Sequence, residues 1–185
     1  MGKVITASAV SVDGFITGRD PGPGRGLGDG GMLFDWYGDR DERNTRLFDT
    51  LSGRVGAMVA GRNTYDDSEG FDGGSPHPTA PLVVVTHRPV PEASERQTIV
   101  TTGIEDAVEA AQKLAGGKDV GVMGGGAVTA ALQAGLIDEL VLHQVPIMLG
   151  AGRPYFQELP SHIRLTLVDV VAAPGVTHLH YEVQR

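Results

Sequence analysis

The segment Leu82–Thr86 (LVVVT) restricts the fold most, because it is apolar without alternating polar positions. A strand of this kind is covered on both faces, as in sheets whose parallel strands are joined by helices. Strands are expected at Lys3–Val12, Gly56–Ala60, Leu82–Thr86, Gln97–Thr101, Val120–Met123, Glu139–Val145, Ile163–Val171 and Val176–Val183. Segments with helical spacing lie between several of them. This alternation predicts an α/β fold with a largely parallel sheet and helices on both faces.

The remaining segments are expected to be helices, loops and one hairpin. Helices are predicted over Asp39–Leu51, after the capping-box pattern Thr102-x-x-Glu105, and over Ala127–Ala134. The Gly/Pro-rich segments Asp20–Gly31 and Gly70–Pro81 are predicted to be surface loops, and the first is long enough to serve as a lid. Ala172–Gly175 joins the last two strands as an antiparallel hairpin, which makes the sheet mixed.

Length and composition exclude several classes of protein. A chain of 185 residues without an internal repeat or clear linker predicts one domain over residues 1–185. The net charge of −8 argues against general nucleic-acid binding, and the absence of Cys excludes disulfides and thiolate catalysis. No apolar run is long enough to span a bilayer and no signal peptide is evident, so we expect a cytoplasmic protein without membrane partners. His178-x-His180 has no evident third ligand, so no metal is expected.

The clearest chemical signal follows the strand Val120–Met123, where Gly124-Gly125-Gly126-Ala127-Val128-Thr129 opens a helix. Ligands of such sheets bind beyond the carboxyl ends of the strands. Glycines let backbone amides approach an anion closely, and a helix N-terminus adds free N–H groups. The pattern favours a pyrophosphate site over a plain turn, although it lacks the spacing of a Rossmann fingerprint.

Two further strand ends carry groups suited to phosphate. Gly61-Arg62-Asn63-Thr64 follows one strand, and Thr86-His87-Arg88 ends another. Arginine presents fork-shaped donors to phosphate oxygens, although for either segment alone solvated charges are the favoured interpretation. Three such strand ends at one edge of an acidic protein predict a dinucleotide site. Asp13, in an Asp-Gly turn after the first strand, caps the turn or lies near the chemistry, and the turn is the favoured interpretation.

In this order along nearly the whole chain, these motifs resemble the dihydrofolate reductase-like superfamily. The resemblance also includes S-x-D-G-x-I within Val4–Gly18 and Pro146–Gly152 (PIMLGAG). It is strongest to the branch containing the C-terminal reductase domain of the riboflavin-biosynthesis deaminase–reductase. Phe15 stands where that branch usually has Lys, and no deaminase signature is present. The resemblance implies a mixed, mostly parallel sheet of about eight strands with a C-terminal antiparallel hairpin, and a homodimer.

The resemblance further implies that NADPH binds in an extended pose. The residues it assigns to the cofactor are Ala9, Ile16, Gly61, Arg62, Asn63, Thr64, Thr86, His87, Arg88, Met123, Gly124, Gly125, Gly126, Ala127 and Val128. Among these, Thr86, His87 and Arg88 would surround the 2′-phosphate, and Ala9 and Ile16 the nicotinamide. The relationship also admits a cis peptide between Gly124 and Gly125.

The implied function is an NADPH-dependent reductase that transfers a hydride to a small heterocyclic, carbonyl or imine substrate. Residues expected at the substrate are Trp36, Ile147, Leu149 and Gly150. Candidates for the proton donor are Asp13 and Asp41, with water as the alternative. For the carboxylate that grips the pteridine in dihydrofolate reductases, the resemblance points to Asp41, with Asp35, Asp39 and Asp49 as alternatives. Other classes that fit the sequence are a nucleotide-binding module without turnover and an enzyme using a flavin or S-adenosylmethionine.

Overall fold

The computed structural model describes residues 2–38, 41–89 and 93–184. Its strands are β1 (Val4–Ser11), β2 (Val55–Gly61), β3 (Leu82–Val85), β4 (Gln97–Val100), β5 (Asp119–Met123), β6 (Glu139–Val145), β7 (Leu165–Ala173) and β8 (Val176–Val183). Its helices are α1 (Glu42–Arg54), α2 (Arg62–Asp67), α3 (Ile104–Leu114) and α4 (Gly125–Gln133), with 3₁₀ helices η1 (Gly28–Gly38) and η2 (Glu69–Gly73).

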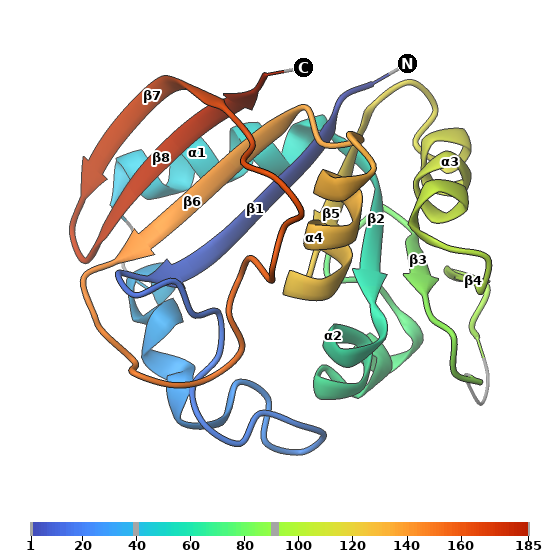
Figure 1. Cartoon of the computed structure of the whole chain (residues 1–185), viewed down its shortest axis with the longest axis horizontal. Helices are drawn as coiled ribbons and strands as arrows, with labels where there is room; N and C mark the ends of the chain where they lie inside the picture. The colour runs from blue at the N-terminus through green and yellow to red at the C-terminus, as the bar shows by residue number, and fades with distance from the viewer. Residues whose placement is uncertain (1, 39–40, 90–92, 185) are drawn as a thin grey trace.

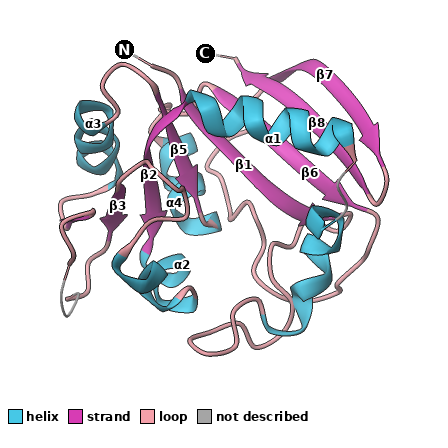
Figure 2. Ribbon diagram, turned by 180° about the vertical axis from the view of Figure 1, so that it is seen from behind, coloured by secondary structure: helices cyan, strands magenta, loops and turns pink. Residues whose placement is uncertain are grey.

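The described strands form one eight-stranded sheet in the order β4-β3-β2-β5-β1-β6-β8-β7. Pairing is parallel from β4 through β6 and antiparallel for β6–β8 and β8–β7 (Figure 1). Helices α3 and α4 cover one face, and α1 crosses the other (Figure 2). The predicted mixed sheet with a C-terminal hairpin is therefore confirmed.

Strand β3 shows why the apolar run predicted burial on both faces. Val83 packs in the cluster that contains Val108 of α3, whereas Leu82 and Val84 pack with Tyr65 on the opposite face. These three β3 side chains are fully buried. Burial of a Val or Leu side chain stabilises a fold by roughly 1.5–3 kcal/mol, so both faces contribute.

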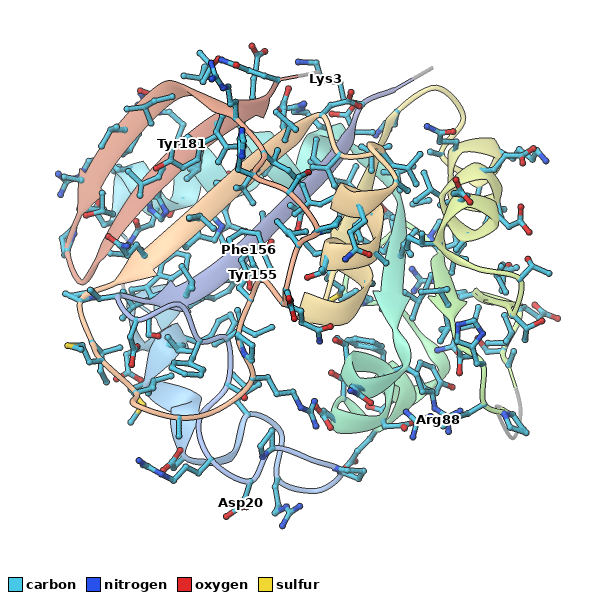
Figure 3. The ribbon with its side chains drawn as sticks, viewed as in Figure 1. Lys3, Asp20, Arg88, Tyr155, Phe156 and Tyr181 are labelled. Atoms are coloured by element: carbon cyan, nitrogen blue, oxygen red, sulfur yellow. The ribbon has the colours of Figure 1, made fainter. Side chains whose placement is uncertain are left out.

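A buried tyrosine connects the segment before β7 to the centre of the sheet. The Tyr155 hydroxyl lies 2.5 Å from Thr6 Oγ1, which donates to the Val122 carbonyl at 2.8 Å. Because the Thr6 proton is used in that bond, Tyr155 donates its own proton to Thr6. Burial raises the pKa of Tyr155, so the phenol stays protonated. Figure 3 shows Tyr155 and Phe156 near the middle of the molecule and Arg88 at its edge.

Local predictions differ from the structure at the starts of two described helices. The predicted capping box at Thr102 is wrong: Gly103, at φ 130°, precedes α3 without a side-chain cap, because the chain enters the helix through a conformation that suits glycine. Helix α4 begins at Gly125, so two of the three glycines lie in its first turn rather than before it. The predicted start of the first helix, at residues 39 and 40, lies outside the described residues.

The predicted loop Asp20–Gly31 is irregular only in its first part. From Gly28 the chain forms η1, in which Leu33 and Trp36 are buried. Each helix in the described part of the chain is too short or too polar to cross a bilayer.

Candidate active site

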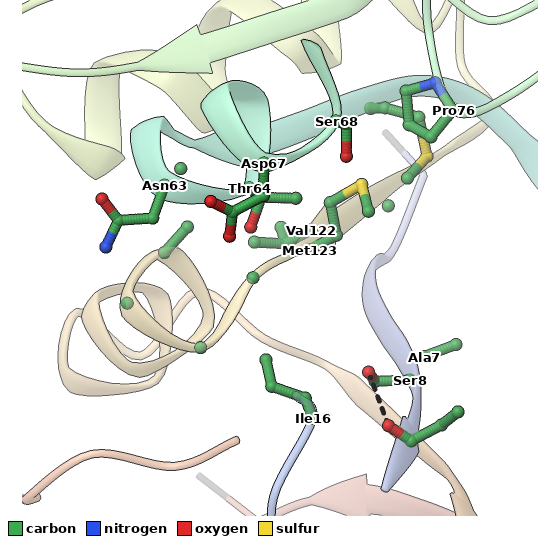
Figure 4. A pocket seen from close by; sticks show the side chains of 18 of the residues that line it. Ala7, Ser8, Ile16, Asn63, Thr64, Asp67, Ser68, Pro76, Val122 and Met123 are labelled. Atoms are coloured by element: carbon green, nitrogen blue, oxygen red, sulfur yellow. Dashed lines mark hydrogen bonds between the residues drawn. The ribbon is translucent and has the colours of Figure 1, made fainter. Parts of the chain in front are cut away.

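A large cleft of about 1420 Å³ opens on the sheet. Residues of β1 line it, together with the segments that directly follow β2, β3 and β5. In Figure 4, Asn63, Thr64, Asp67 and Ser68 of the α2 region lie on one side, and Ala7, Ser8 and Ile16 lie apart from them. The three strand ends that carry the predicted phosphate-binding groups therefore share one cavity.

The glycine turn after β5 forms one wall of this cleft. Gly124 has φ +88°, and an added Cβ there would collide with Thr64 Oγ1. An added Cβ on Gly125 would lie 2.6 Å from the Pro154 carbonyl oxygen, whereas on Gly126 its nearest neighbour would be Gln157 Nε2 at 3.7 Å. Two glycines are thus needed for packing, and the third leaves the backbone accessible from the cleft.

This turn fits the diphosphate of a dinucleotide. The first N–H groups of α4 have no partner within the helix, and Gly125, Gly126 and Ala127 all line the cleft. A helix N-terminus of this kind attracts an anion. Val128 is fully buried in the core and is not part of the cleft lining. The peptide between Gly124 and Gly125 is trans, so the cis form admitted by the resemblance is wrong.

The other side chains that were predicted to bind phosphate are linked by hydrogen bonds and ion pairs. Arg62 donates from Nε to Asp66 at 2.7 Å and from Nη1 to the Pro89 carbonyl at 2.6 Å. Arg88 donates from Nη2 to Asn63 Oδ1 at 3.1 Å and lies 3.4 Å from Asp66. Arg88 is largely exposed and lies beside the cleft rather than in its lining.

Thr86 supports this network through the backbone. Its hydroxyl accepts from the Arg88 N–H at 2.9 Å and donates to the Arg88 carbonyl at 3.0 Å, which shapes the turn after β3. Thr86 and His87 line the cleft. Asp66 was not anticipated from the sequence, yet it is the carboxylate shared by both arginines. An incoming phosphate would compete with Asp66 for them.

An ion pair between Arg153 and Asp67 joins the segment after Gly152 to α2. Both residues line the cleft, and both were missed by the sequence reasoning. The Arg153 backbone also accepts from the Ile16 N–H and donates to Thr17 Oγ1. This ion pair therefore fixes the position of one cleft wall relative to the other.

The part of the cleft beyond β1 is aromatic. Phe34, Trp36, Tyr37 and Phe48 line it, and the Tyr37 and Phe48 rings meet edge-on with centroids 4.5 Å apart. We call this part the aromatic end of the cleft. Asp49 of α1 also lines the cleft and is exposed, and it is one of the acidic alternatives from the sequence. Flat aromatic walls and a carboxylate suit a planar heterocycle.

Asp13 and Asp41, the preferred proton-donor candidates, are absent from the lining of the cleft. Asp13 accepts from Ser11 Oγ at 2.6 Å and from the Leu149 and Gly150 N–H groups at 3.1 and 2.7 Å. The Ser11 hydroxyl and these amides hold the pKa of Asp13 below its usual value. Asp13 is thus an ionised acceptor that ties Leu149 and Gly150 to the turn after β1.

Asp41 caps helix α1. It accepts from the Arg43 N–H and Nε, each at 2.9 Å, and Arg43 lowers the pKa of Asp41 to about 2. A carboxylate held in this way does not store a proton near neutral pH. The structure therefore favours Asp49 over Asp41 as the acidic group available to a ligand.

Of the four expected substrate residues, Trp36 lines the cleft, whereas Ile147, Leu149 and Gly150 lie outside its lining. Ile147 and Leu149 pack instead against the small core cluster that contains Trp36. They support the aromatic wall from behind. Backbone hydrogen bonds hold these residues next to the turn after β1. For example, the Val12 N–H donates to the Ile147 carbonyl at 2.8 Å.

Two buried histidines lie under the aromatic end. His143 of β6 pairs in register with Ala9 of β1 and His178 of β8. Its Nδ1 lies 2.8 Å from His178 Nδ1, and His178 Nε2 lies 2.8 Å from Asn44 Oδ1. Both rings pack at 5.3 Å from the Trp36 ring.

The two imidazoles are neutral near physiological pH. Burial, with a smaller contribution from His178, lowers the pKa of His143 to about 3, and burial also lowers the pKa of His178. His143 lines the cleft, so this pair borders the space available to a ligand. His180 instead lies 3.2 Å from Glu139, and no group of three potential metal ligands occurs among the described residues.

Comparison of the chain with known proteins identifies a matching family. The family model of the RibD C-terminal domain matches residues 2–179. The uncharacterized protein YwjB of Bacillus subtilis (strain 168) is 27% identical over 180 residues, which cover 97% of each protein.

Solved structures agree with this match. A protein from Shewanella sp. PV-4, provisionally named a riboflavin biosynthesis protein, is 28% identical with a TM-score of 0.75, and each chain is fully covered. The dihydrofolate reductase from Enterococcus faecalis, complexed with NADP(H), has a TM-score of 0.66 at 17% identity, covering 100% of this chain and 98% of that one. At this identity the second match shows a shared fold.

Proposed function

Because the chain belongs to the RibD C-terminal domain family, we propose that it is an NADPH-dependent reductase of a small planar heterocycle. The observation that carries the proposal is a single cleft with two kinds of wall. One is the glycine turn with the free N–H groups of α4, and the other is the aromatic end. A dinucleotide spanning the cleft would bring its nicotinamide toward Ala9 and Ile16, beside the aromatic end.

Different residues of the chain would bind the cofactor and the substrate. Gly125, Gly126 and Ala127 would bind the diphosphate, and Arg62 and Arg88 would bind a 2′-phosphate after releasing Asp66. When bound, NADPH supplies a hydride to the substrate. The aromatic walls would orient the substrate ring, and the Asp49 carboxylate would accept a hydrogen bond from a polar group of that ring. Water at the open side of the cleft would supply the proton.

Titration of NADPH and NADH against the purified protein, followed by cofactor fluorescence, tests the cofactor assignment. Tighter binding of NADPH is expected. Oxidation of NADPH is then screened with dihydrofolate, pterins and riboflavin precursors as substrates. Absence of binding to either cofactor contradicts the proposal, whereas binding without turnover of any substrate favours a nucleotide-binding module.

We also propose that the protein forms a homodimer through β7. This strand is at the end of the sheet, and the apolar side chains Leu165, Leu167, Val168 and Val170 are 39–54% exposed on it. An edge strand with exposed apolar side chains is a surface that a twofold partner can cover.

A further inference from the structure

The His143–His178–Asn44 chain has polar atoms that the proposed cofactor site does not use. Its protons can be assigned by following the hydrogen bonds. With the Asn44 amide oriented so that Oδ1 faces His178 Nε2 at 2.8 Å, Oδ1 accepts and His178 Nε2 carries the donated proton. A neutral imidazole has one N–H, so His178 Nδ1 is an acceptor. His143 Nδ1 must then donate across the 2.8 Å contact between the two rings.

This assignment leaves His143 Nε2 without a proton. Nε2 makes no hydrogen bond to another described residue. Among fully enclosed side-chain N and O atoms of the described residues, Asn44 Nδ2 alone lacks a partner, so His143 Nε2 is not fully enclosed. His143 lines the cleft, and we infer that its accessible Nε2 faces that cleft.

The surroundings keep this nitrogen an acceptor. His143 is nearly inaccessible apart from this edge, with 4% of its surface exposed, and Trp36 packs against both imidazoles. A cation in such an environment is disfavoured by desolvation. The ring therefore offers a fixed lone pair rather than a proton.

We propose that His143 Nε2 is the hydrogen-bond acceptor that selects the substrate, which is a planar heteroaromatic ring carrying an N–H or NH₂ donor. His178 and Asn44 are positioning residues that set the His143 tautomer. The inference rests on the proposed function only in taking the aromatic end as the substrate site. A ring without such a donor would leave Nε2 desolvated and without a hydrogen-bond partner. It should therefore bind more weakly than a ring that carries the donor.

The tautomer is tested first, in the wild-type protein without any ligand. Long-range ¹H–¹⁵N NMR of the histidine side chains is expected to show His143 protonated at Nδ1 and bare at Nε2. A His143 ring protonated at Nε2 would overturn the proposal. This measurement requires no variant and no turnover.

Ligand selection is tested with two rings that differ by one amine, 4-aminoquinazoline and quinazoline, by calorimetry. We expect the amine to improve binding to the wild-type protein about tenfold, as one well-formed hydrogen bond allows. His143→Asn retains a donor toward His178 but has no atom at the Nε2 position, and should lose this preference. His143→Gln places an amide oxygen near the Nε2 position and should retain most of it.

Each outcome of the calorimetry either supports or overturns the proposed role of His143. A preference that survives in His143→Asn, or that is absent in the wild-type protein, overturns the proposal. Both variants should still bind NADPH, because the glycine turn that would hold its diphosphate lies in a separate part of the cleft. If the amine preference depends on His143 but no substrate oxidises NADPH, the reductase assignment fails while the acceptor role stands.

Discussion

Gly126 is a residue at which ligand binding and stability can be separated. An added Cβ meets nothing closer than Gln157 Nε2 at 3.7 Å, but it points where an anion would approach the α4 amides. Gly126→Ala should leave the free energy of unfolding unchanged or raised by up to about 1 kcal/mol, since Ala is the better helix former. The Kd for NADPH should rise about tenfold or more, as measured by fluorescence titration.

Two other glycines serve as controls for this substitution. Gly53→Ala, on an open surface of α1, should raise the free energy of unfolding by up to about 1 kcal/mol for the same reason and leave cofactor affinity unchanged. Gly124→Ala should destabilise the protein by at least about 1–3 kcal/mol, because φ is +88° and the methyl group collides with Thr64. Unchanged NADPH affinity in Gly126→Ala would contradict the assignment of the diphosphate to this turn.

His143 gives a pH dependence whose sign follows from its burial. Its pKa is lowered from 6.5 to about 3. Between pH 6.5 and about pH 3, the unfolded chain therefore binds a proton at this residue that the folded protein does not bind. The free energy of unfolding should therefore fall as the pH drops below about 6.5, by at most about 1.4 kcal/mol per pH unit for this proton. Above that pH, His143 adds no further dependence.

Urea unfolding at about pH 7 and about pH 5 measures this effect. His143→Asn should lose less stability than the wild-type protein between these conditions. Glu139, whose pKa is lowered from 4.5 to about 2 because Arg54 and Lys3 outweigh its burial, acts mainly below this window. Equal losses in the two proteins would show that His143 titrates normally in the folded state.

At the scale of elements, sequence patterns predicted what depends on local sequence and burial. The apolar run of β3 and the apolar stripe of α3 are such patterns. The predicted stripe comprises Ala107, Val108, Ala111, Leu114 and Ala115, and all of it is buried except Leu114, which is 46% exposed at the end of the helix. Leu82, Val83 and Val84 of β3 are buried as well. Helix η1 was expected to be partly loop, since its Gly-rich start gives no helical signal. It is held instead by tertiary burial of Leu33 and Trp36, which no local pattern reveals.

The site residues also divide into those that a local sequence pattern reveals and those that come together only through tertiary contacts. The glycine turn was found because Gly124–Gly126 is a local motif after a strand. The Arg153–Asp67 pair spans 86 positions of the chain, and the His143–His178 pair depends on the register of β6 against β8. Sequence reasoning had no means to pair such residues, and it overestimated Asp13 and Asp41 because their local partners were unknown.

The α2 element and the turn after β3 together define the expected 2′-phosphate site. Arg88→Ala should raise the KM for NADPH by about tenfold or more and leave the KM for NADH nearly unchanged, because only NADPH carries that phosphate. Arg96→Ala is a matched control, since Arg96 donates to the carbonyls of His77, Pro78 and Ala80 at distances of 3.2–3.3 Å and is absent from the cleft lining. Equal effects of Arg88→Ala on both cofactors would contradict the site.

At the scale of the whole molecule, the cleft and the exposed edge lie on different parts of the sheet. The glycine turn follows β5, whereas β7 is separated from β5 by β1, β6 and β8. Assembly through β7 would therefore leave the glycine turn accessible. This separation lets the oligomeric state and cofactor binding be tested independently.

The proposed dimer should have twice the chain mass of 19.4 kDa in sedimentation velocity. Leu167→Asp, at a side chain that is 54% exposed, places a charge on the edge strand and should yield monomers, because an unpaired charge buried at an interface costs several kcal/mol. Leu114→Asp, at a side chain that is 46% exposed on α3, is the matched control and should remain dimeric. Both variants should bind NADPH as the wild-type protein does. A monomeric wild-type protein, or dissociation only in Leu114→Asp, would show that β7 is not the interface.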